Sequence, residues 1–451
     1  MVQSGSALPG IAAHVAERDP ASASDRFHGV RLSDSFDPRA LFAGRHAHDV
    51  VASYERPDRG FALVAVGVAA RVQLDPGAPI SALRTAASAL LARPLATEHH
   101  ALRPRLLGGF AFDTARTPAG PWAGFAAGSL LLPRLLFVRD GALSGVVLAP
   151  GVDRSELDAL CARAAAPAPP ADEGAPPRLV QDFDATAWQS AVTELAAGVR
   201  SGRYEKVVLA ATRELGGVAP IDVGATLARL RSGYPHCHLF SFAHDGATFL
   251  GASPELLVSV AGGAVRALGL AGSARRGATP AEDDALGDAL LASAKDRREH
   301  EIVVRAVRAG LAPLTDELHA AAEPVLQRLP NIQHLATDVR ARARAGTDLL
   351  ALIAGLHPTP AVCGWPADAA RRAIYEHEPF ERGWYAGTVG WLDAAGEGEF
   401  AVALRSALVR GPRAWLFAGA GIMGDSCPAD ELAEIELKFR PLTGALTGGR
   451  A

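Results

Sequence analysis

A single lysine stands at the start of an apolar segment. In YEKVVLAA (204–211), Lys206 comes directly before the run from Val207 to Ala211, which has the length and composition of a strand buried on both faces. A lysine in this position can lay its stem along the strand and keep its amine in water. It can also be a partly desolvated amine that serves as a general base. The segment alone leaves both interpretations open.

A glutamate opens a second apolar segment. GASPELLVSV places Glu255 after Pro254 and before two leucines. Apolar surroundings favour the neutral form of a carboxylic acid, which suits a general acid. An exposed glutamate at the end of a strand has the same signature. Lys206 and Glu255 can act as base and acid only if the fold brings them together, and their spacing does not decide that.

Two predicted helices carry paired carboxylates. In AKDRREHEIVVRAV, Asp296 and Glu299 stand at i and i+3 and share one face. In ELAEIELKF, Glu431 and Glu434 have the same spacing, and Lys438 follows one turn later. Carboxylates crowded on one face need a cation opposite, and oxygen ligands favour a hard cation such as Mg²⁺. A solvated acidic face is the alternative for each helix.

Several loops have the composition of anion-binding or pocket-forming segments. LAGSARRG (270–277) offers backbone N–H groups and arginines, and FAGAGIMG (417–424) would let the backbone approach a small anion closely. Arg405 lies in a segment predicted to be a buried strand, where a guanidinium needs an anionic partner. HPTPAVCGWP (357–366) predicts a stiff turn that suits a pocket wall. Each segment alone is also compatible with ordinary loop chemistry.

The composition is that of a globular chain with ample material for a core. It is 49% hydrophobic and 21% charged, and its net charge of −4 does not indicate nucleic acid or an anionic membrane as a partner. Four scattered cysteines without a CxxC pair favour a reduced, cytoplasmic protein. We expect no signal peptide, because MVQSGSALPG lacks a basic segment followed by an apolar one. The longest apolar runs are too short to span a bilayer.

The chain divides into parts of different character. Residues 1–45 predict an irregular lead-in, and residues 46–163 alternate short apolar runs with turns, as expected of a sheet. The proline-rich segment 164–177 predicts a surface connection. Residues 185–445, which hold the segments quoted above, form the remaining part and begin with an amphipathic helix for which Asp184 is a candidate N-cap.

Ten short segments of the chain, several of them described above, occur together in one order. The order runs EKVVLA, GASPELL, LAGSARR, KDRREHE, NIQHLATDV, LHPTPAVCG, ERGWYAGTVGW, FAVALRSA, AGAGI and ELAEIELK. In identity and order this set resembles the chorismate-binding enzymes, which include isochorismate, salicylate, anthranilate and aminodeoxychorismate synthases. The resemblance is dense over 185–445 and sparser upstream, at GGFAFD (108–113) and LLLPRLLF (130–137).

The resemblance implies an α/β (α+β) fold in which two antiparallel sheets pack face to face with helices outside, in one domain over residues 46–451. It implies that Lys206 activates water for attack on C2 of chorismate and that Glu255 protonates the departing C4 hydroxyl. It implies that Glu299 and Glu434 bind Mg²⁺, with Asp296 and Glu431 reaching the ion through water. The positions that match those around the ring and its carboxylates are Gly272, Ser273, His334, Tyr385, Arg405, Gly419, Gly421 and Lys438.

The resemblance also separates members of the family. Amine-forming members lack a lysine at the position of Lys206 and need a glutaminase, of which this chain has no recognisable segment. Salicylate synthases carry threonine where this chain has Ala361. An alanine followed by an aliphatic residue, here Val362, resembles the pattern of the isochorismate synthases at this position. We therefore predict an isochorismate synthase, with a salicylate synthase or an ammonia-using synthase subunit as alternatives. We expect no glutaminase partner and a monomer or weak homodimer, in siderophore, salicylate or menaquinone synthesis.

Overall fold

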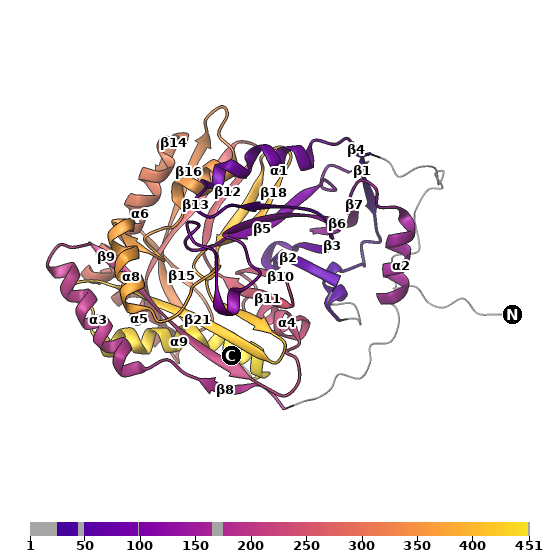
Figure 1. Ribbon diagram of the computed structural model, residues 1–451. Coiled ribbons are helices and arrows are strands. Elements are labelled where there is room, and N and C mark those ends of the chain that lie inside the picture. The colour runs from indigo at the N-terminus through magenta and orange to yellow at the C-terminus, as the bar shows by residue number, and fades with distance from the viewer. Residues whose placement is uncertain (1–24, 44–48, 98, 165–174, 450–451) are drawn as a thin grey trace.

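The computed structural model describes residues 25–43, 49–97, 99–164 and 175–449 (Figure 1). Two long runs of hydrogen-bonded strands make up most of the fold. The first run has the order β8 (Arg178–Gln181), β9 (Lys206–Gly216), β21 (Arg413–Ile422), β20 (Ser406–Arg410), β11 (Ala247–Ser253), β10 (His238–His244), β2 (Val50–Arg56), β3 (Phe61–Leu74) and β6 (Gly128–Asp140). A short strand, β17 (Gly364–Trp365), pairs with the start of β9.

The second run leaves β6 in the other direction. Its order is β5 (Arg105–Phe110), β18 (Thr388–Asp393), β19 (Gly398–Val402), β12 (Leu256–Ala261), β13 (Ala264–Arg275) and β16 (Ile332–Ala343), with β14 (Thr315–Ala320) and β15 (Val325–Arg328) at its far edge. Every pairing in these two runs of described strands is antiparallel. The predicted fold class, helices with antiparallel sheet, is confirmed. The two layers share β6 and so form one continuous ladder of 21 strands.

The two runs face each other across a buried interior. Tyr54 of β2 is fully buried, and its hydroxyl donates a hydrogen bond of 2.9 Å to Glu399 Oε1 on β19. Strands buried on both faces are rich in apolar residues, and β5 is buried along its whole length. Because β6 belongs to both runs, the two layers cannot be separated without breaking its backbone hydrogen bonds.

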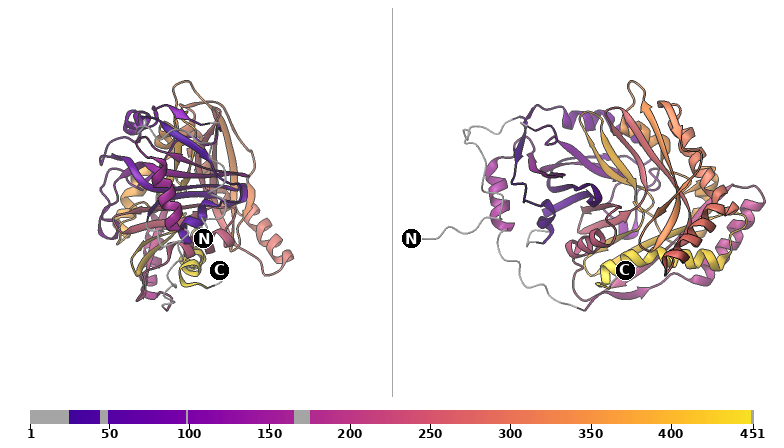
Figure 2. Two further views of the ribbon diagram at one scale, coloured as in Figure 1. Left: turned by 90° about the vertical axis from the view of Figure 1, so that its right-hand side faces the viewer. Right: turned by 180° about the vertical axis from the view of Figure 1, so that it is seen from behind.

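Helices cover the outer faces of both runs. Their bounds are α1 (Arg84–Leu91), α2 (Arg154–Ala164), α3 (Ala185–Arg200), α4 (Val223–Gly233), α5 (Pro280–Ala292), α6 (Ala294–Leu311), α7 (Leu349–Leu356), α8 (Ala367–His377) and α9 (Pro428–Thr447). Helices α4 and α9 pack on the first run, α5, α6 and α7 on the second, and α3 and α8 against β9. Figures 1 and 2 show α3, α6, α8 and α9 gathered at one end of the molecule, with α2 at the other.

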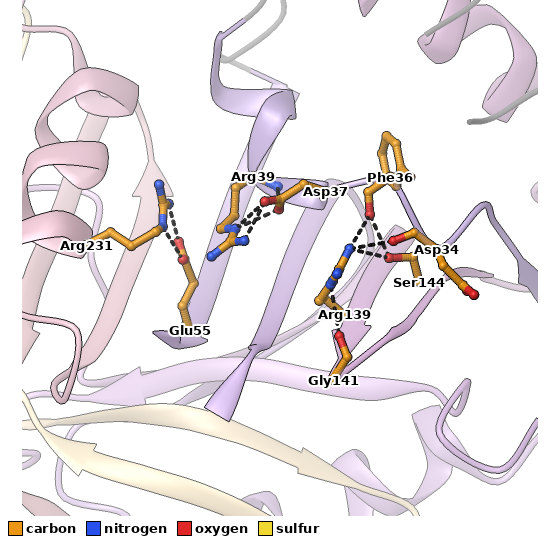
Figure 3. A network of polar contacts seen from close by, with 9 residues as sticks. All are labelled: Asp34, Phe36, Asp37, Arg39, Glu55, Arg139, Gly141, Ser144 and Arg231. Atoms are coloured by element: carbon orange, nitrogen blue, oxygen red, sulfur yellow. Dashed lines mark hydrogen bonds and ion pairs between the residues drawn. The ribbon is translucent and has the colours of Figure 1, made fainter. Parts of the chain in front are cut away.

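The N-terminal part differs from the predicted lead-in. Within residues 25–43, β1 (Phe27–Arg31) pairs with β7 (Leu143–Leu148) and β4 (Leu95–Ala96). Arg139 anchors the next segment, because its Nη1 donates to the carbonyls of Asp34 (2.9 Å) and Phe36 (3.1 Å) (Figure 3). The segment is ordered by contacts with residues a hundred positions away, and its own polar composition gives no sign of them.

Two further expectations concern the middle of the chain. The predicted connection over 164–177 falls mostly on residues 165–174, which lie outside the described residues. The predicted N-cap is confirmed: the Asp184 carboxylate accepts hydrogen bonds from the backbone N–H groups of Thr186 and Ala187 at the start of α3. Among the described residues, none of the helices combines the length and apolar character of a membrane-spanning segment.

Candidate active site

Lys206 is the first residue of β9 and its side chain is buried. Strand β9 pairs with β21 along its length, with Val208 opposite Gly421 and Ala210 opposite Gly419. The Lys206 side chain is 1% exposed, so its amine does not reach bulk water. The apolar run after Lys206 packs against β21, α3 and α8, and Lys206 is buried because it belongs to the same strand.

The partner of Lys206 is a glutamate from the opposite layer. Lys206 Nζ lies 2.8 Å from Glu299 Oε1, and Glu299 belongs to α6, which packs on β13. The contact is an ion pair whose orientation does not make a hydrogen bond, and Nζ has no other hydrogen-bond partner in the described chain. The amine is therefore held in place by charge while its hydrogens remain available to a ligand.

Gly421 makes room for this ion pair. A Cβ atom at this position would lie 2.2 Å from Glu299 Oε1 and 2.8 Å from Lys206 Cε. Any side chain on β21 at this point would push the two charged groups apart. Gly421 therefore allows the side chains of Lys206 and Glu299 to approach the backbone of β21 closely.

Glu255 lies in the short link between β11 and β12 and lines the same cleft as Lys206. It is 2% exposed. Burial raises the pKa of its carboxyl to about 8, although the charges of Lys206 and Lys438 act in the opposite direction. At neutral pH this carboxyl is mostly protonated and can donate a proton into the cleft.

Helices α6 and α9 bring the four predicted carboxylates together. Glu299 and Glu434 line the cleft, whereas Asp296 and Glu431 lie behind them. Burial, and after it the charge of Glu434, raises the pKa of Glu431 to about 7. Burial, and the charge of Glu299, also raises the pKa of Asp296. The cluster therefore holds more negative charge than its surroundings compensate.

Lysines from the same two helices neutralise part of this charge. Lys295 Nζ lies 2.6 Å from Glu431 Oε1, and Lys438 Nζ lies 2.5 Å from Glu434 Oε1. The described residues contain no group of three or more His, Cys, Asp or Glu side chains arranged to hold a metal ion. Mg²⁺ typically takes only one or two protein carboxylates and completes its shell with water and substrate oxygens. Two glutamates facing one cleft, backed by carboxylates with raised pKa values, fit that ion.

The opposite wall of the cleft carries a guanidinium without a carboxylate partner. Arg405 is 7% exposed, and Nη2 donates a hydrogen bond of 3.3 Å to His334 Nε2. No carboxylate in the described part of the chain forms an ion pair with it, although a buried guanidinium requires a counter-charge. An anionic ligand in the cleft would supply one.

The position of Arg405 differs from the sequence prediction. It lies between β19 and β20, not within a strand, and its φ of +47° is in the left-handed region that a side chain rarely adopts. Residues held in such conformations concentrate at functional sites, because the surrounding structure must impose them. Here the turn points the guanidinium toward the cleft.

His334 connects Arg405 with the glycine loop of β13. Burial, followed by the charge of Arg405, lowers the pKa of His334 well below its usual range, so the ring is neutral. Because Nε2 accepts from Arg405, Nδ1 carries the hydrogen, and it lies 3.2 Å from the carbonyl oxygen of Gly272 and 3.0 Å from Ser273 Oγ. Gly272 has a φ of +75° and forms a bulge opposite β16, which turns Ser273 toward His334.

Tyr385, Gly419 and Lys438 complete the floor. Lys438 Nζ donates a hydrogen bond of 2.8 Å to the carbonyl oxygen of Gly419. A Cβ atom at Gly419 would lie 3.0 Å from the Tyr385 hydroxyl, so the glycine keeps this contact open. Burial raises the pKa of Tyr385, which keeps the phenol neutral and able to donate a hydrogen bond.

The predicted site residues converge on one cleft that opens to solvent, and the empty space of the cleft and its mouth together is about 660 Å³. Thirteen of them line it, and Asp296 and Glu431 stand behind. Sequence reasoning missed the apolar walls, for example Leu404 and Phe417, because such residues look like any core residue. It also missed Lys295, for which a signal existed. Only three of the 45 lysines and arginines are lysines, and all three belong to the cleft or its acidic cluster.

Comparison with known proteins gives a consistent result. The family described as chorismate binding enzyme matches residues 19–447. The "Salicylate biosynthesis isochorismate synthase" of Pseudomonas aeruginosa is 43% identical over 365 residues, covering 77% of this chain and 75% of that protein. The "Isochorismate synthase MenF" of Bacillus subtilis is 34% identical over 361 residues, covering 78% and 77%. The solved menaquinone-specific isochorismate synthase MenF of Escherichia coli has a TM-score of 0.76 at 29% identity, covering 93% and 94%.

Glu255 provides a test that does not depend on the reaction. Its pKa of about 8 in the folded protein lies above the ordinary 4.5, so the folded state binds the extra proton between these values. Its contribution to the free energy of unfolding is therefore complete below about pH 4.5 and is lost as the pH rises through 8. Glu255→Gln removes this dependence. Relative to the variant, the wild type should lose roughly 1 kcal/mol per pH unit in this window.

The measurement is urea unfolding of metal-free wild type and Glu255→Gln at pH 5, 6.5 and 8. The neighbouring groups with raised pKa values are common to both proteins and cancel in the difference. If the two proteins lose stability in parallel across this range, Glu255 is not held protonated in the folded state.

Proposed function

The chain belongs to the chorismate-binding enzymes and is an isochorismate synthase, and we propose that Lys206 is its base, Glu255 its acid and Mg²⁺ its cofactor. The substrate is chorismate, and the product, isochorismate, differs only in the position of the ring hydroxyl. The observation that carries the assignment of roles is the pairing in one cleft of a buried lysine with a glutamic acid that is protonated at neutral pH.

The exchange of hydroxyls requires one proton to be removed and another to be delivered. In its deprotonated form, Lys206 Nζ takes a proton from water as the oxygen attacks C2, and the ammonium that results forms the ion pair with Glu299, 2.8 Å away. Glu255 gives its proton to the C4 hydroxyl, which leaves as water while the ring double bonds shift. One water enters and one leaves, so the atoms balance.

The charges of the cleft suit a dianionic substrate. Arg405 has no carboxylate partner in the described chain and can take one substrate carboxylate, with the Gly419 loop and Lys438 beside it. Glu299 and Glu434 would hold the metal ion on the side of the acidic helices. Mg²⁺, when bound, supplies the positive charge that offsets the other carboxylate. The neutral His334 and Tyr385 orient the ring without adding charge.

Water as the nucleophile makes a glutaminase partner unnecessary, and we propose that the chain acts without one. The same argument disfavours an ammonia-using subunit, because Lys206 occupies the place where water must be activated. We also propose that isochorismate is the end product, not salicylate. This choice rests on Ala361, which lines the cleft next to Val362.

The role of Lys206 can be separated from its charge. Lys206→Ala should lower kcat by about 10²–10⁴-fold, because proton abstraction is lost. Lys206→Arg keeps a cation beside Glu299 but cannot give up a proton at neutral pH, so it should be as inactive. Isochorismate formation is measured by chromatography, with circular dichroism to confirm folding. Turnover near the wild-type rate in either variant would exclude Lys206 as the base.

The metal requirement is tested with a matched pair of glutamates on α9. Activity should disappear in a chelator and return with Mg²⁺. Glu434→Gln should raise the Mg²⁺ concentration for half-maximal activity by at least about tenfold, an effect seen even when indirect partners of a metal are removed. Glu436 lies two residues further on and pairs with Arg213 away from the cleft, so Glu436→Gln should leave the requirement unchanged. Full activity of the wild type without divalent metal would refute the cofactor assignment.

Ala361 predicts the fate of the product. Loss of pyruvate from isochorismate needs the enolpyruvyl group held over the ring in a near-attack geometry. Ala361→Thr adds a methyl and a hydroxyl to the wall that could press the side chain into that position. The variant should form more pyruvate than the wild type, in which isochorismate accumulates in equilibrium with chorismate.

A product time course with a coupled pyruvate assay measures this partition. Ala322→Thr, at an exposed position outside the cleft, is the control and should not change it. Equal amounts of salicylate and pyruvate from the wild type near neutral pH would contradict isochorismate as the end product.

A further inference from the structure

A second buried ion pair lies directly behind the wall of the cleft. Arg382 Nε donates to Glu378 Oε2 at 2.7 Å and Nη2 donates to Glu378 Oε1 at 2.5 Å. Their side chains are 3% and 2% exposed, so both charges are removed from water. Neither residue lines the cleft, and no step of the reaction described above uses them.

The pair takes the place of a neighbouring strand along β9. Strand β17 pairs with β9 only at Lys206 and Val207. Beyond that point the Val208 carbonyl accepts a hydrogen bond of 2.9 Å from Arg382 Nη2, and the Ala210 N–H donates one of 2.7 Å to Glu378 Oε1. Buried backbone groups need such partners, and here two side chains provide them.

The same guanidinium also reaches the wall turn. Arg382 Nη1 donates a hydrogen bond of 2.8 Å to the carbonyl oxygen of Val362, the neighbour of Ala361. The guanidinium lies 4.3 Å from the ring centroid of Phe112 and 5.9 Å from that of Tyr385. One planar group thus contacts the strand of the base and the turn of Ala361, and approaches Tyr385.

Stability alone does not account for this arrangement. Buried ion pairs are often replaced by apolar residues of similar volume without loss of stability, because removing two charges from water is costly. The fixed, planar fork of arginine instead imposes directions on several hydrogen bonds at once, which lysine or glutamine cannot do. Here Arg382 directs two of these hydrogen bonds to the carbonyl oxygens of Val208 and Val362, and both residues line the cleft.

We propose that Glu378 and Arg382 are positioning residues that fix the β9 strand behind Lys206 relative to the Ala361–Val362 wall. They touch neither substrate nor metal. The inference rests on the proposed function, because the geometry they set matters only if Lys206 and this wall act on the same ring. A displacement of about 1 Å in such a geometry can cost around 10²-fold in rate.

Three variants separate positioning from folding. Arg382→Gln and Glu378→Gln each leave one buried charge without a partner and should be destabilised. The double variant Glu378→Gln/Arg382→Gln removes both charges, and its thermal stability should recover toward wild type. Its kcat should nevertheless stay at least about tenfold below wild type, because glutamine cannot span the Val208 and Val362 carbonyls. KM for chorismate should stay close to wild type, since Arg405 and Lys438 lie on other elements.

Glu55 and Arg231 provide the matched control. They also form a two-pronged pair, with Arg231 Nε at 2.7 Å and Nη2 at 2.8 Å from the Glu55 oxygens, and the Glu55 side chain is fully buried (Figure 3). This pair joins α4 to β2 and does not line the cleft. The corresponding single and double glutamine variants should change stability in the same way and leave kcat unchanged.

The outcomes distinguish a failure of the positioning role from a failure of the proposed function. A Glu378→Gln/Arg382→Gln variant that regains wild-type kcat along with its stability would overturn the positioning role and leave the proposed function intact. Single variants whose kcat falls only in proportion to their unfolded fraction would overturn it as well. Absence of isochorismate formation by the wild type and the Glu55 control variants would overturn the proposed function, and the positioning role with it.

Discussion

The buried ion pair between Lys206 and Glu299 is the constraint around which the cleft is built. Two opposite charges removed from water stabilise each other only if neighbouring elements hold them in contact. Strand β9 supplies one charge and α6 the other, so the two layers must meet at this point. Gly421 is required beside them, since its missing side chain leaves the space that the carboxylate fills. The protonated Glu255 follows from the same crowding, because a further carboxylate in this interior is held neutral by burial.

The cleft uses lysine and arginine for different tasks. Arginine stays charged in any protein environment and directs several hydrogen bonds in one plane, which suits Arg405 toward an anion and Arg382 toward backbone carbonyls. Lysine can surrender its proton, and each of the three lysines lies beside a glutamate: Lys206 beside Glu299, Lys295 beside Glu431 and Lys438 beside Glu434. The neutral His334 and Tyr385 separate these charges within the cleft and keep the number of cations low.

Much of the site could be predicted from the sequence, because its residues sit in segments whose order is distinctive. Lys206, Glu255 and the i, i+3 carboxylates have recognisable positions relative to apolar runs, and the fold brings them together in or behind one cleft, which their spacing alone did not decide. The strand interpretation of Arg405 was wrong, because a single left-handed residue between β19 and β20 leaves no trace in the hydrophobic pattern. The role of Glu378 and Arg382 also could not be predicted from the sequence. In EHEPFER they look like a surface pair, and only the unpaired edge of β9 gives them their partners. The N-terminal strand β1 escaped prediction for the same reason, since its partners β4 and β7 lie far along the chain.

The scarcity of lysine has a consequence for chemical modification. Because the chain has only three lysines and all belong to the cleft or its acidic cluster, an amine-selective acylating reagent that modifies any lysine side chain does so there. Lys206 is shielded by burial, so Lys295 and Lys438 would react first, and each acylation would remove the positive charge that faces Glu431 or Glu434. The same reaction on most proteins scatters label over the surface. In this one, label on side chains reports on a single region, and bound ligand or metal would be detected as protection of Lys295 and Lys438.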